Sequence, residues 1–297
     1  MASRIIEFFG YDAGDTSGPA KQARDARYCP FLKSTCVKTL NDGEVSGACT
    51  LQPATSGPVI CCPIRLYADN YKILKDVAET VFPGPLALVA GNLARHTPVP
   101  AGHAKVAVFG KGWGGELRLP NRGKSGGYFV DWILALLDGN GELVEFVAVE
   151  VQSIDTTGNY RKEREDLLSG RVPSKLSTAG FNWENVSKRI LPQLIYKGHA
   201  LRQDSLCKKG LFFVCPTPVY NKIRERLAGK LLSYGLQPGA LTLVHYDIGP
   251  EVPAGQVRDL LCVGSFTTTV DQVALAFTSP SNLPPVDAYQ KVIREAL

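Results

Sequence analysis

Two apolar runs joined by a tight turn decide the fold: Tyr128-Phe-Val-Asp-Trp-Ile-Leu-Ala-Leu-Leu137 and Leu143-Val-Glu-Phe-Val-Ala-Val-Glu-Val-Gln152, with Asp138-Gly-Asn-Gly141 between them. Asn-Gly between apolar runs is a strong hairpin signal, so we predict two antiparallel strands. Residues i and i+2 of a strand share a face, which puts Glu150 and Gln152 on one side. Asp131, on the paired strand, can reach the same point. Two carboxylates and an amide are therefore expected to converge at the strand ends.

Burying two carboxylates together is costly unless a cation neutralises them. Carboxylate and amide oxygens are hard ligands that suit Mg²⁺. We therefore predict a metal-dependent phosphodiester-cleaving site in which Asp131 and Glu150 hold catalytic Mg²⁺. The alternative for this pair is an isolated hairpin salt bridge.

The order of apolar runs outward from the hairpin predicts an α/β domain with a mixed β-sheet flanked by helices. The chain has 297 residues, enough for a large core. We expect strands at 106–109, 116–119, 211–215, 241–246 and 257–263, and helices at the N-terminus and at 67–82, 182–204, 218–234, 270–277 and 286–296. A change in composition near residue 66 divides the chain into a small loop-rich module, 1–66, and a larger domain, 67–297.

Five of the eight cysteines fall in this N-terminal module, namely Cys29, Cys36, Cys49, Cys61 and Cys62. A loop-rich segment with few aliphatic residues needs an internal cross-link, and four thiolates around a tetrahedral metal would supply it. Gaps of 6, 12 and 12 residues, counting Cys62 as the fourth member, are looser than a CxxC pattern. Buried free thiols are the alternative. Zinc and iron both accept four sulfur ligands, so the metal stays open.

Charge and hydropathy exclude several classes of protein. No apolar run reaches the roughly 18 residues of a membrane span, and the N-terminus lacks a signal-peptide core, so we expect a cytoplasmic protein with no membrane partner. Gly123-Lys-Ser125 lacks the upstream glycine of a phosphate-binding loop, and no nucleotide cofactor is expected. A net charge of +5 permits a polyanionic partner. Basic residues gather at 188–209 and 222–230, although a solvated helix face would look the same.

These residues resemble the NotI family of restriction endonucleases through a series of motifs in the same order along the chain. The motifs are Glu7-Phe-Phe-Gly10, Cys29-Pro-Phe-Leu32, Thr35-Cys-Val-Lys38, Gly47-Ala-Cys49, Cys62-Pro-Ile-Arg65, Gly114-Gly-Glu-Leu117, Phe129-Val-Asp-Trp132, Val149-Glu-Val-Gln152 and Val186-Ser-Lys-Arg189 with Gln193 and Tyr196-Lys197. The agreement is weaker over the C-terminal part of the chain. The chain is also shorter than NotI itself.

The resemblance implies a restriction-endonuclease-like PD-(D/E)xK core that acts as a homodimer on palindromic, GC-rich double-stranded DNA. It implies an N-terminal module around iron, with Cys29, Cys36, Cys49 and Cys62 at the ligand positions and Cys61 outside them. The active-site residues of the family correspond to Glu116, Asp131, Glu150 and Gln152. The wider superfamily usually has lysine at the last position, whereas the NotI pattern has glutamine.

Each of these residues has an expected role. Gln152 cannot act as a base, but its amide can orient water or phosphate. Glu116 could bind a second metal ion or orient water; otherwise it is a solvated carboxylate at a strand end. The polar stretch after the second strand should face DNA, with Asp155, Arg161 and Arg164 as candidate contacts to bases or phosphates.

Three functions fit these observations. The first is a site-specific type II restriction endonuclease that requires Mg²⁺. The second is a DNA-binding regulator with a structural four-cysteine module and no cleavage. The third is a repair nuclease with the same chemistry that selects junctions or mismatches.

Overall fold

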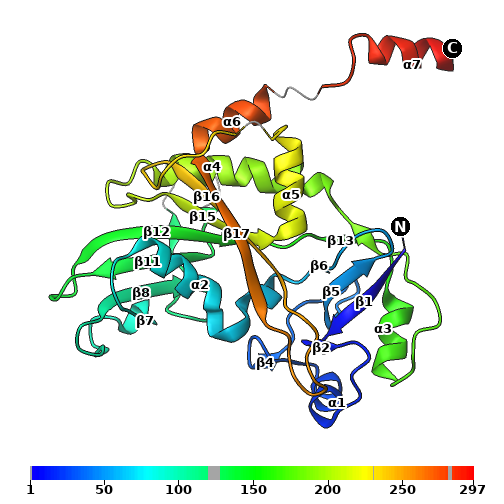
Figure 1. Cartoon of the computed structure of the whole chain (residues 1–297), viewed down its shortest axis with the longest axis horizontal. Coiled ribbons are helices and arrows are strands. Elements are labelled where there is room, and N and C mark those ends of the chain that lie inside the picture. Colours follow the sequence, from blue (N-terminus) through cyan, green and yellow to red (C-terminus); the bar gives the residue numbers. More distant parts are fainter. Residues whose placement is uncertain (1, 120–127, 230, 280–282) are drawn as a thin grey trace.

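The computed structural model describes residues 2–119, 128–229, 231–279 and 283–297, and its centre is a seven-stranded mixed sheet (Figure 1). The strand order is β17-β16-β15-β12-β11-β8-β7. The strands β12, β15 and β16 run parallel, as do β7 and β8, while the other neighbours are antiparallel. Their bounds are β7 Leu86–Ala90, β8 Ala104–Gly110, β11 Trp132–Leu137, β12 Leu143–Val151, β15 Leu211–Pro216, β16 Ala240–Ile248 and β17 Leu260–Thr269. The predicted α/β class with a mixed sheet is confirmed.

Helices cover the sheet on both faces. Successive residues of β15 alternate between two cores: Leu211 and Phe213 pack in one, and Phe212 and Val214 in the other. The first core includes α4 (Leu191–Leu201), α5 (Thr217–Arg226) and α6 (Val270–Thr278), and the second includes α2 (Ala68–Val81). Burial on both faces explains why β15 is apolar throughout rather than alternating.

The predicted hairpin forms as β11 and β12. Trp132 pairs with Val149 and Leu137 with Leu143, and the amide of Asp138 donates to the carbonyl of Glu142 at the turn. Gly141, with φ +82°, takes the left-handed conformation that such a turn requires.

The N-terminus forms a strand, so the short helix predicted there is wrong. β1 (Ser3–Phe8) pairs with β5 (Ala48–Pro53) in a four-stranded sheet. The side chains of Ser3, Ile5 and Glu7 are buried on one face, while Arg4 is exposed. A period of two suits a strand, and the pairing partner is distant in the sequence, beyond the reach of local reasoning.

The N-terminal region, 1–66, therefore contains more regular structure than the expected loop-rich module. Its remaining elements are β2 (Tyr11–Asp12), α1 (Gly18–Asp25), β3 (Tyr28–Cys29), β4 (Ser34–Thr35), β6 (Val59–Ile60) and the 3₁₀ turn η1 (Pro63–Tyr67). The amides of Ser3 and Ser177 each donate to the carbonyl of the other residue, which joins β1 to the later chain. The division at residue 66 stays a prediction.

Elsewhere the predicted helices and strands are largely present, with shifted ends. The long helix predicted from 182 begins later, with the π-helical turn η3 (Val186–Ile190) followed by α4. α3 (Arg161–Leu168) was not predicted, because its sequence is mostly charged. The expected strand 116–119 is reduced to β9 (Arg118–Leu119), which pairs with β10 (Tyr128–Phe129) outside the main sheet. Short elements complete the chain: η2 (Gly91–Leu93), β13 (Thr156–Thr157), β14 (Gly180–Phe181) and the C-terminal α7 (Ala288–Ala296), which extends away from the body (Figure 1).

Within the described ranges, no helix has both the length and the apolar character needed to cross a bilayer. Gly123-Lys-Ser125, rejected above as a phosphate-binding loop, lies outside the described residues.

Candidate active site

Asp131 and Glu150 meet at the end of the β11–β12 hairpin. The register that pairs Trp132 with Val149 puts Asp131 opposite Glu150, one step further along. The amide of Asp131 donates to Glu150 Oε2 at 3.0 Å, and the amide of Val151 donates to Asp131 Oδ2 at 2.8 Å. Each carboxylate is thus fixed by the backbone of the opposite strand.

Close packing of Trp132 beneath the two carboxylates anchors this end of the hairpin. Trp132 is 1% exposed, and its indole Nε1 donates to the hydroxyl of Tyr67 at 3.2 Å. Gly110 is the last residue of β8 and pairs with Trp132 of β11. A Cβ added at Gly110 would lie 2.1 Å from the indole ring. The glycine at this position therefore serves packing within the chain.

The two carboxylates differ in their surroundings, although both were expected to be buried. Glu150 is 7% exposed, while Asp131 is open to solvent on one side. Enclosure of the Asp131 carboxylate by surrounding protein raises its pKa, and the charge of Glu116 adds to this rise. The Val151 amide and the Lys197 ammonium act in the opposite direction. The site holds more negative charge than its own donors neutralise, which favours a cation.

The other two predicted residues flank this pair. Gln152 follows β12 directly; its backbone N–H donates to the carbonyl of Val214 at 3.0 Å, and the residue lines the same cavity as Asp131 and Glu150. Glu116 is exposed and contributes no atoms to that cavity, but its charge reaches Asp131.

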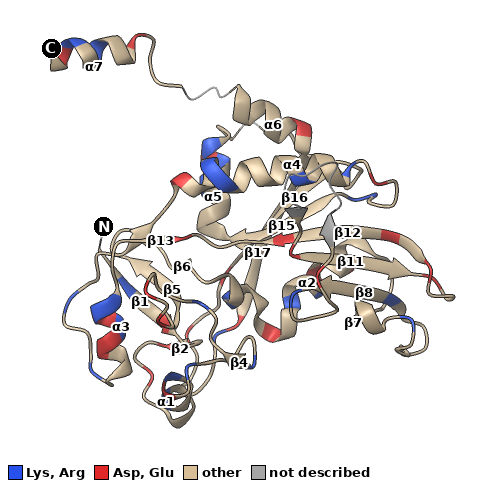
Figure 2. Cartoon of the chain, turned by 180° about the vertical axis from the view of Figure 1, so that it is seen from behind, with Lys and Arg blue, Asp and Glu red and all other residues tan. Residues whose placement is uncertain are grey.

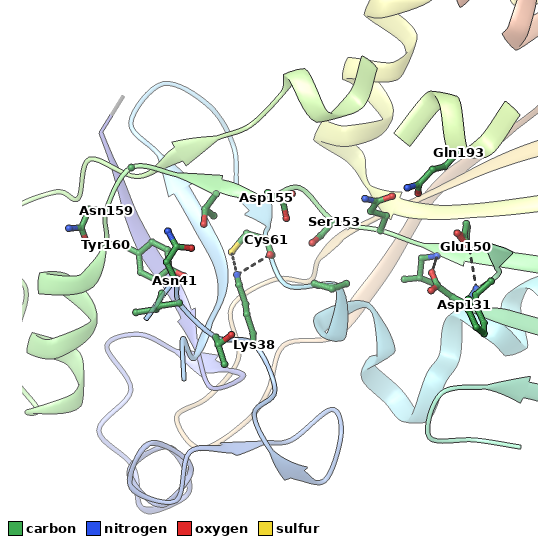
Figure 3. Close-up of a pocket in the computed structure, with 18 of the residues that line it drawn as sticks. Lys38, Asn41, Cys61, Asp131, Glu150, Ser153, Asp155, Asn159, Tyr160 and Gln193 are labelled. Atoms are coloured by element: carbon green, nitrogen blue, oxygen red, sulfur yellow. Dashed lines mark hydrogen bonds between the residues drawn. The ribbon is translucent and has the colours of Figure 1, made fainter. Parts of the chain in front are cut away.

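A cavity of about 820 Å³ extends from the carboxylates to the N-terminal region (Figure 3). Asp131, Glu150 and Gln193 lie at one end of the view, and Asn159 and Tyr160 at the other, with Lys38 and Cys61 between them. The lining comes from β12, the segment after it, α4 and the segment 38–41. This cavity joins the candidate active site to polar side chains that lie far from it in sequence.

Helix α4 contributes two residues that the sequence analysis did not assign to the site. Gln193 and Lys197 are four positions apart, share one helix face and line the cavity. Lys197 Nζ forms a short hydrogen-bonded ion pair with Glu150 Oε1. The sequence did contain a signal for this pair, because Gln193 and Lys197 are four positions apart in a helix that was predicted. It did not show which face of that helix points to the hairpin.

The three candidate DNA contacts lie in different places. Asp155 lines the cavity, and its carboxylate accepts hydrogen bonds from Asn185 and Arg189. Arg161 also lines the cavity and forms a short ion pair with Asp42. Arg164 is 4% exposed; its guanidinium Nε donates to the carbonyl of Val45 at 2.8 Å, so it joins α3 to the N-terminal region.

Most basic side chains of the two clusters have partners within the chain. Figure 2 shows basic residues along α5, where Arg224 and Arg226 lie over Phe266 and Phe277. In the other cluster, Lys209 pairs with Glu145 and Arg202 with Asp271. Lys230 lies outside the described residues. These clusters therefore give little separate support for a DNA-binding face.

The N-terminal thiols gather near one another. Burial raises the pKa of Cys29 and Cys49, and burial raises the pKa of Cys62 to about 12. Their mutual proximity adds to this: Cys36 acts on Cys29 and on Cys62, while Cys29 and Cys62 act on Cys49. No group of three or more His, Cys, Asp or Glu side chains among the described residues has the spacing of a metal site. The four thiols are neighbours but do not form a closed tetrahedral cage.

Cys61 has a different environment from the other four. Lys38 Nζ lies 3.3 Å from its sulfur and donates to the carbonyls of Cys61 and Ala48 at 2.9 and 3.2 Å. The lysine thus links the chain segments beside Cys49 and Cys62. Cys61 still acts on its neighbour, because its charge contributes to the raised pKa of Cys62.

Comparison with known families supports the chemistry that this geometry allows. The family model "Restriction endonuclease NotI" matches residues 12–223, which include the hairpin, the five N-terminal thiols and α4. No curated protein matches the chain. The match covers more than half of the sequence, and the chain belongs to the NotI family of restriction endonucleases, which makes it a site-specific deoxyribonuclease that binds double-stranded DNA.

Proposed function

We propose that this type II restriction endonuclease cuts both strands of a GC-rich palindromic sequence as a Mg²⁺-dependent homodimer with a PD-(D/E)xK core. The observation that carries the metal site is the convergence of Asp131 and Glu150, each fixed by the backbone of the opposite strand. The palindrome, the homodimer and the GC-rich target are inferred from the family.

The carboxylate oxygens of Asp131 and Glu150 and the amide of Gln152 form a donor set that suits a hard divalent cation. Mg²⁺ held there would lower the pKa of a water molecule and neutralise charge on the phosphate. Gln152 orients that water or the phosphate, since an amide can both donate and accept hydrogen bonds but cannot take up a proton. The charge of Glu116 acts on Asp131 and favours cation binding.

The four thiols Cys29, Cys36, Cys49 and Cys62 are the proposed ligands of a structural iron or zinc ion. Their mutual proximity supports this proposal, and the exclusion of Cys61 follows from the family resemblance. Four sulfur donors fit either metal. The ion would remove the protons that burial otherwise holds on Cys29, Cys49 and Cys62.

The contacts to DNA are proposed along the cavity that joins the two sites. Asp155 and Arg161 line it and are offered as contacts to bases or phosphates. Arg164 is offered as a residue that supports Arg161 rather than one that touches DNA, because it is buried three positions further along α3.

Digestion of a sequenced plasmid or genome tests this function directly. With Mg²⁺ we expect discrete fragments, and sequencing of their ends gives the recognised site and the cut position together. Smearing of all DNA, or a preference for junctions over intact duplex, would count against the proposal.

A matched pair of variants on β12 tests the active site. Glu150→Gln should reduce the cleavage rate at least about a thousandfold, because it removes a charged metal ligand. Glu145→Gln changes the same strand at its other end, where the carboxylate pairs with Lys209, and should retain cleavage. Both should still bind the target in a gel-shift assay with Ca²⁺. Equal cleavage by the two variants would exclude Glu150 from the site.

A further inference from the structure

Lys197 is a buried cation placed directly on the proposed metal ligand. Lys197 and Glu150 are each 7% exposed, and the ammonium donates to Glu150 Oε1. α4 holds the lysine there because its apolar face, with Leu194 and Leu201, is buried in the core. The contact thus belongs to the packed interior and differs from an exposed surface ion pair.

Three basic side chains line the cavity among the described residues, and two of them are engaged elsewhere. Lys38 donates to the carbonyls of Ala48 and Cys61, and Arg161 pairs with Asp42. Lys197 is the one of the three whose ammonium contacts a carboxylate of the candidate active site.

The charges around this contact do not balance. Glu150 and Asp131 bring two carboxylates together, and the charge of Glu116 also reaches Asp131. One ammonium offsets one of these charges. A divalent cation at the same carboxylates would neutralise the rest, but it would lie close to the ammonium and repel it.

We propose that Lys197 holds Glu150 in the metal-free enzyme and competes with the divalent cation for that carboxylate, so that metal binding requires the ammonium to leave Glu150. The inference rests on the proposed metal site. It makes Lys197 a positioning residue that acts through Glu150. Lysine suits this role because its charge sits on a flexible four-carbon stem.

DNA should favour the release of the lysine. A phosphate bound in the cavity offers the ammonium another anionic partner, so the cost of leaving Glu150 falls. Metal and DNA would then bind cooperatively, and each would raise the affinity of the protein for the other by the same factor.

Calorimetric titration of the DNA-free protein with Ca²⁺ tests the competition without cleavage. Lys197→Gln keeps a hydrogen-bond donor for Glu150 but removes the charge, and should bind Ca²⁺ about tenfold more tightly than the unaltered protein. Lys197→Arg keeps the charge and should not gain affinity. Lys209→Gln removes the charge of the other β12 ion pair and should match the unaltered protein. Thermal unfolding of each variant confirms that it is folded.

A second titration includes a duplex that carries the sequence found at the fragment ends. The duplex should raise the Ca²⁺ affinity of the unaltered protein by a larger factor than that of Lys197→Gln. Unchanged or weaker Ca²⁺ binding by Lys197→Gln would overturn the competition, even if the protein cleaves DNA as proposed. If the unaltered protein binds no Ca²⁺ with or without DNA, the metal site itself is wrong, and the inference fails with it.

Discussion

In the catalytic sheet, Asp131 and Glu150 come together because the register of β11 and β12 sets them opposite each other, and backbone amides hold both carboxylates. In the N-terminal region, the four thiols come from separate segments. No group of three or more side chains that could hold a metal occurs among the described residues of either region. A sheet that is packed on both faces can hold a site before its metal binds. The N-terminal region shares both apolar cores with the sheet, and the proposed metal would add a cross-link between its separate segments.

The largest expected effect comes from removing a thiol ligand from the N-terminal region. Cys49→Ser should lose the structural metal and, with it, the order of this region, since metal binding in small modules contributes roughly 10–16 kcal/mol of folding free energy. Elemental analysis should fall from about one atom of iron or zinc per chain to none. Circular dichroism should show a separate unfolding step at lower temperature.

Cys61→Ser is the matched control, because Cys61 lies beside Cys62 and contacts Lys38 but is not one of the proposed ligands. It should keep the metal. If Cys49→Ser retained iron or zinc, or if the unaltered protein contained neither, the N-terminal region would not depend on a metal bound by these four thiols.

A smaller effect is expected at the buried ion pair of the N-terminal region. Arg65 and Glu7 are both fully buried, and Arg65 Nε donates to Glu7 Oε2 at 3.0 Å. Thr50 donates a short hydrogen bond to the same carboxylate, and Arg65 Nη2 reaches the carbonyl of Arg258 at 2.8 Å. Arg65→Met leaves Glu7 buried without its charge partner and should lower the free energy of unfolding by about 3–5 kcal/mol.

Urea unfolding followed by fluorescence measures this loss. The double variant Glu7→Leu with Arg65→Met removes both charges and should recover most of the stability, because no unpaired charge remains. A double variant that is as unstable as Arg65→Met would mean that the shape of the pair, and not its charge, holds β1 against η1.

The sequence predicted the catalytic hairpin well because its information is local. The Asn-Gly turn and the two apolar runs determine the strands, and the period of two places Asp131 and Glu150 together. The strand β1 was not predicted, because its partner β5 is distant in the sequence: Ser3 pairs with Pro53. Short-range patterns cannot distinguish such a strand from a short helix.

The same limit applies to the site itself. Gln193 and Lys197 lie on a helix that the sequence predicts, but their place beside Glu150 depends on how α4 packs on the sheet. The solvent exposure of Asp131 also depends on tertiary structure, so the expectation of two buried carboxylates was only half right. The convergence of Asp131 and Glu150 follows from one hairpin and could be predicted, whereas the contact that α4 adds through Lys197 could not.

The smallest effect is expected for a polar contact within the catalytic sheet, where apolar packing provides most of the stability. His245 on β16 stacks on Tyr220 with ring centroids 4.2 Å apart, and its Nδ1 lies 2.9 Å from the hydroxyl of Thr217. Partial burial lowers the pKa of His245, against an opposing effect of Asp247. The imidazole of His245 therefore binds a proton less readily in the folded protein than in the unfolded chain. The stability that the neutral imidazole contributes is fully present above a pH of about 6.5, and it is lost as the pH falls toward the lower pKa of the folded state.

His245→Gln should remove this pH dependence. When the pH falls from about 8 to about 5.5, the variant should lose less free energy of unfolding than the unaltered protein. The difference should be below about 1 kcal/mol, because solvent screens a half-buried ring. Urea midpoints at the two pH values measure it, with the exposed His103→Gln as the control. A pH effect as large as the loss in Arg65→Met would contradict the comparison, because it would show that the sheet also depends on a single polar contact.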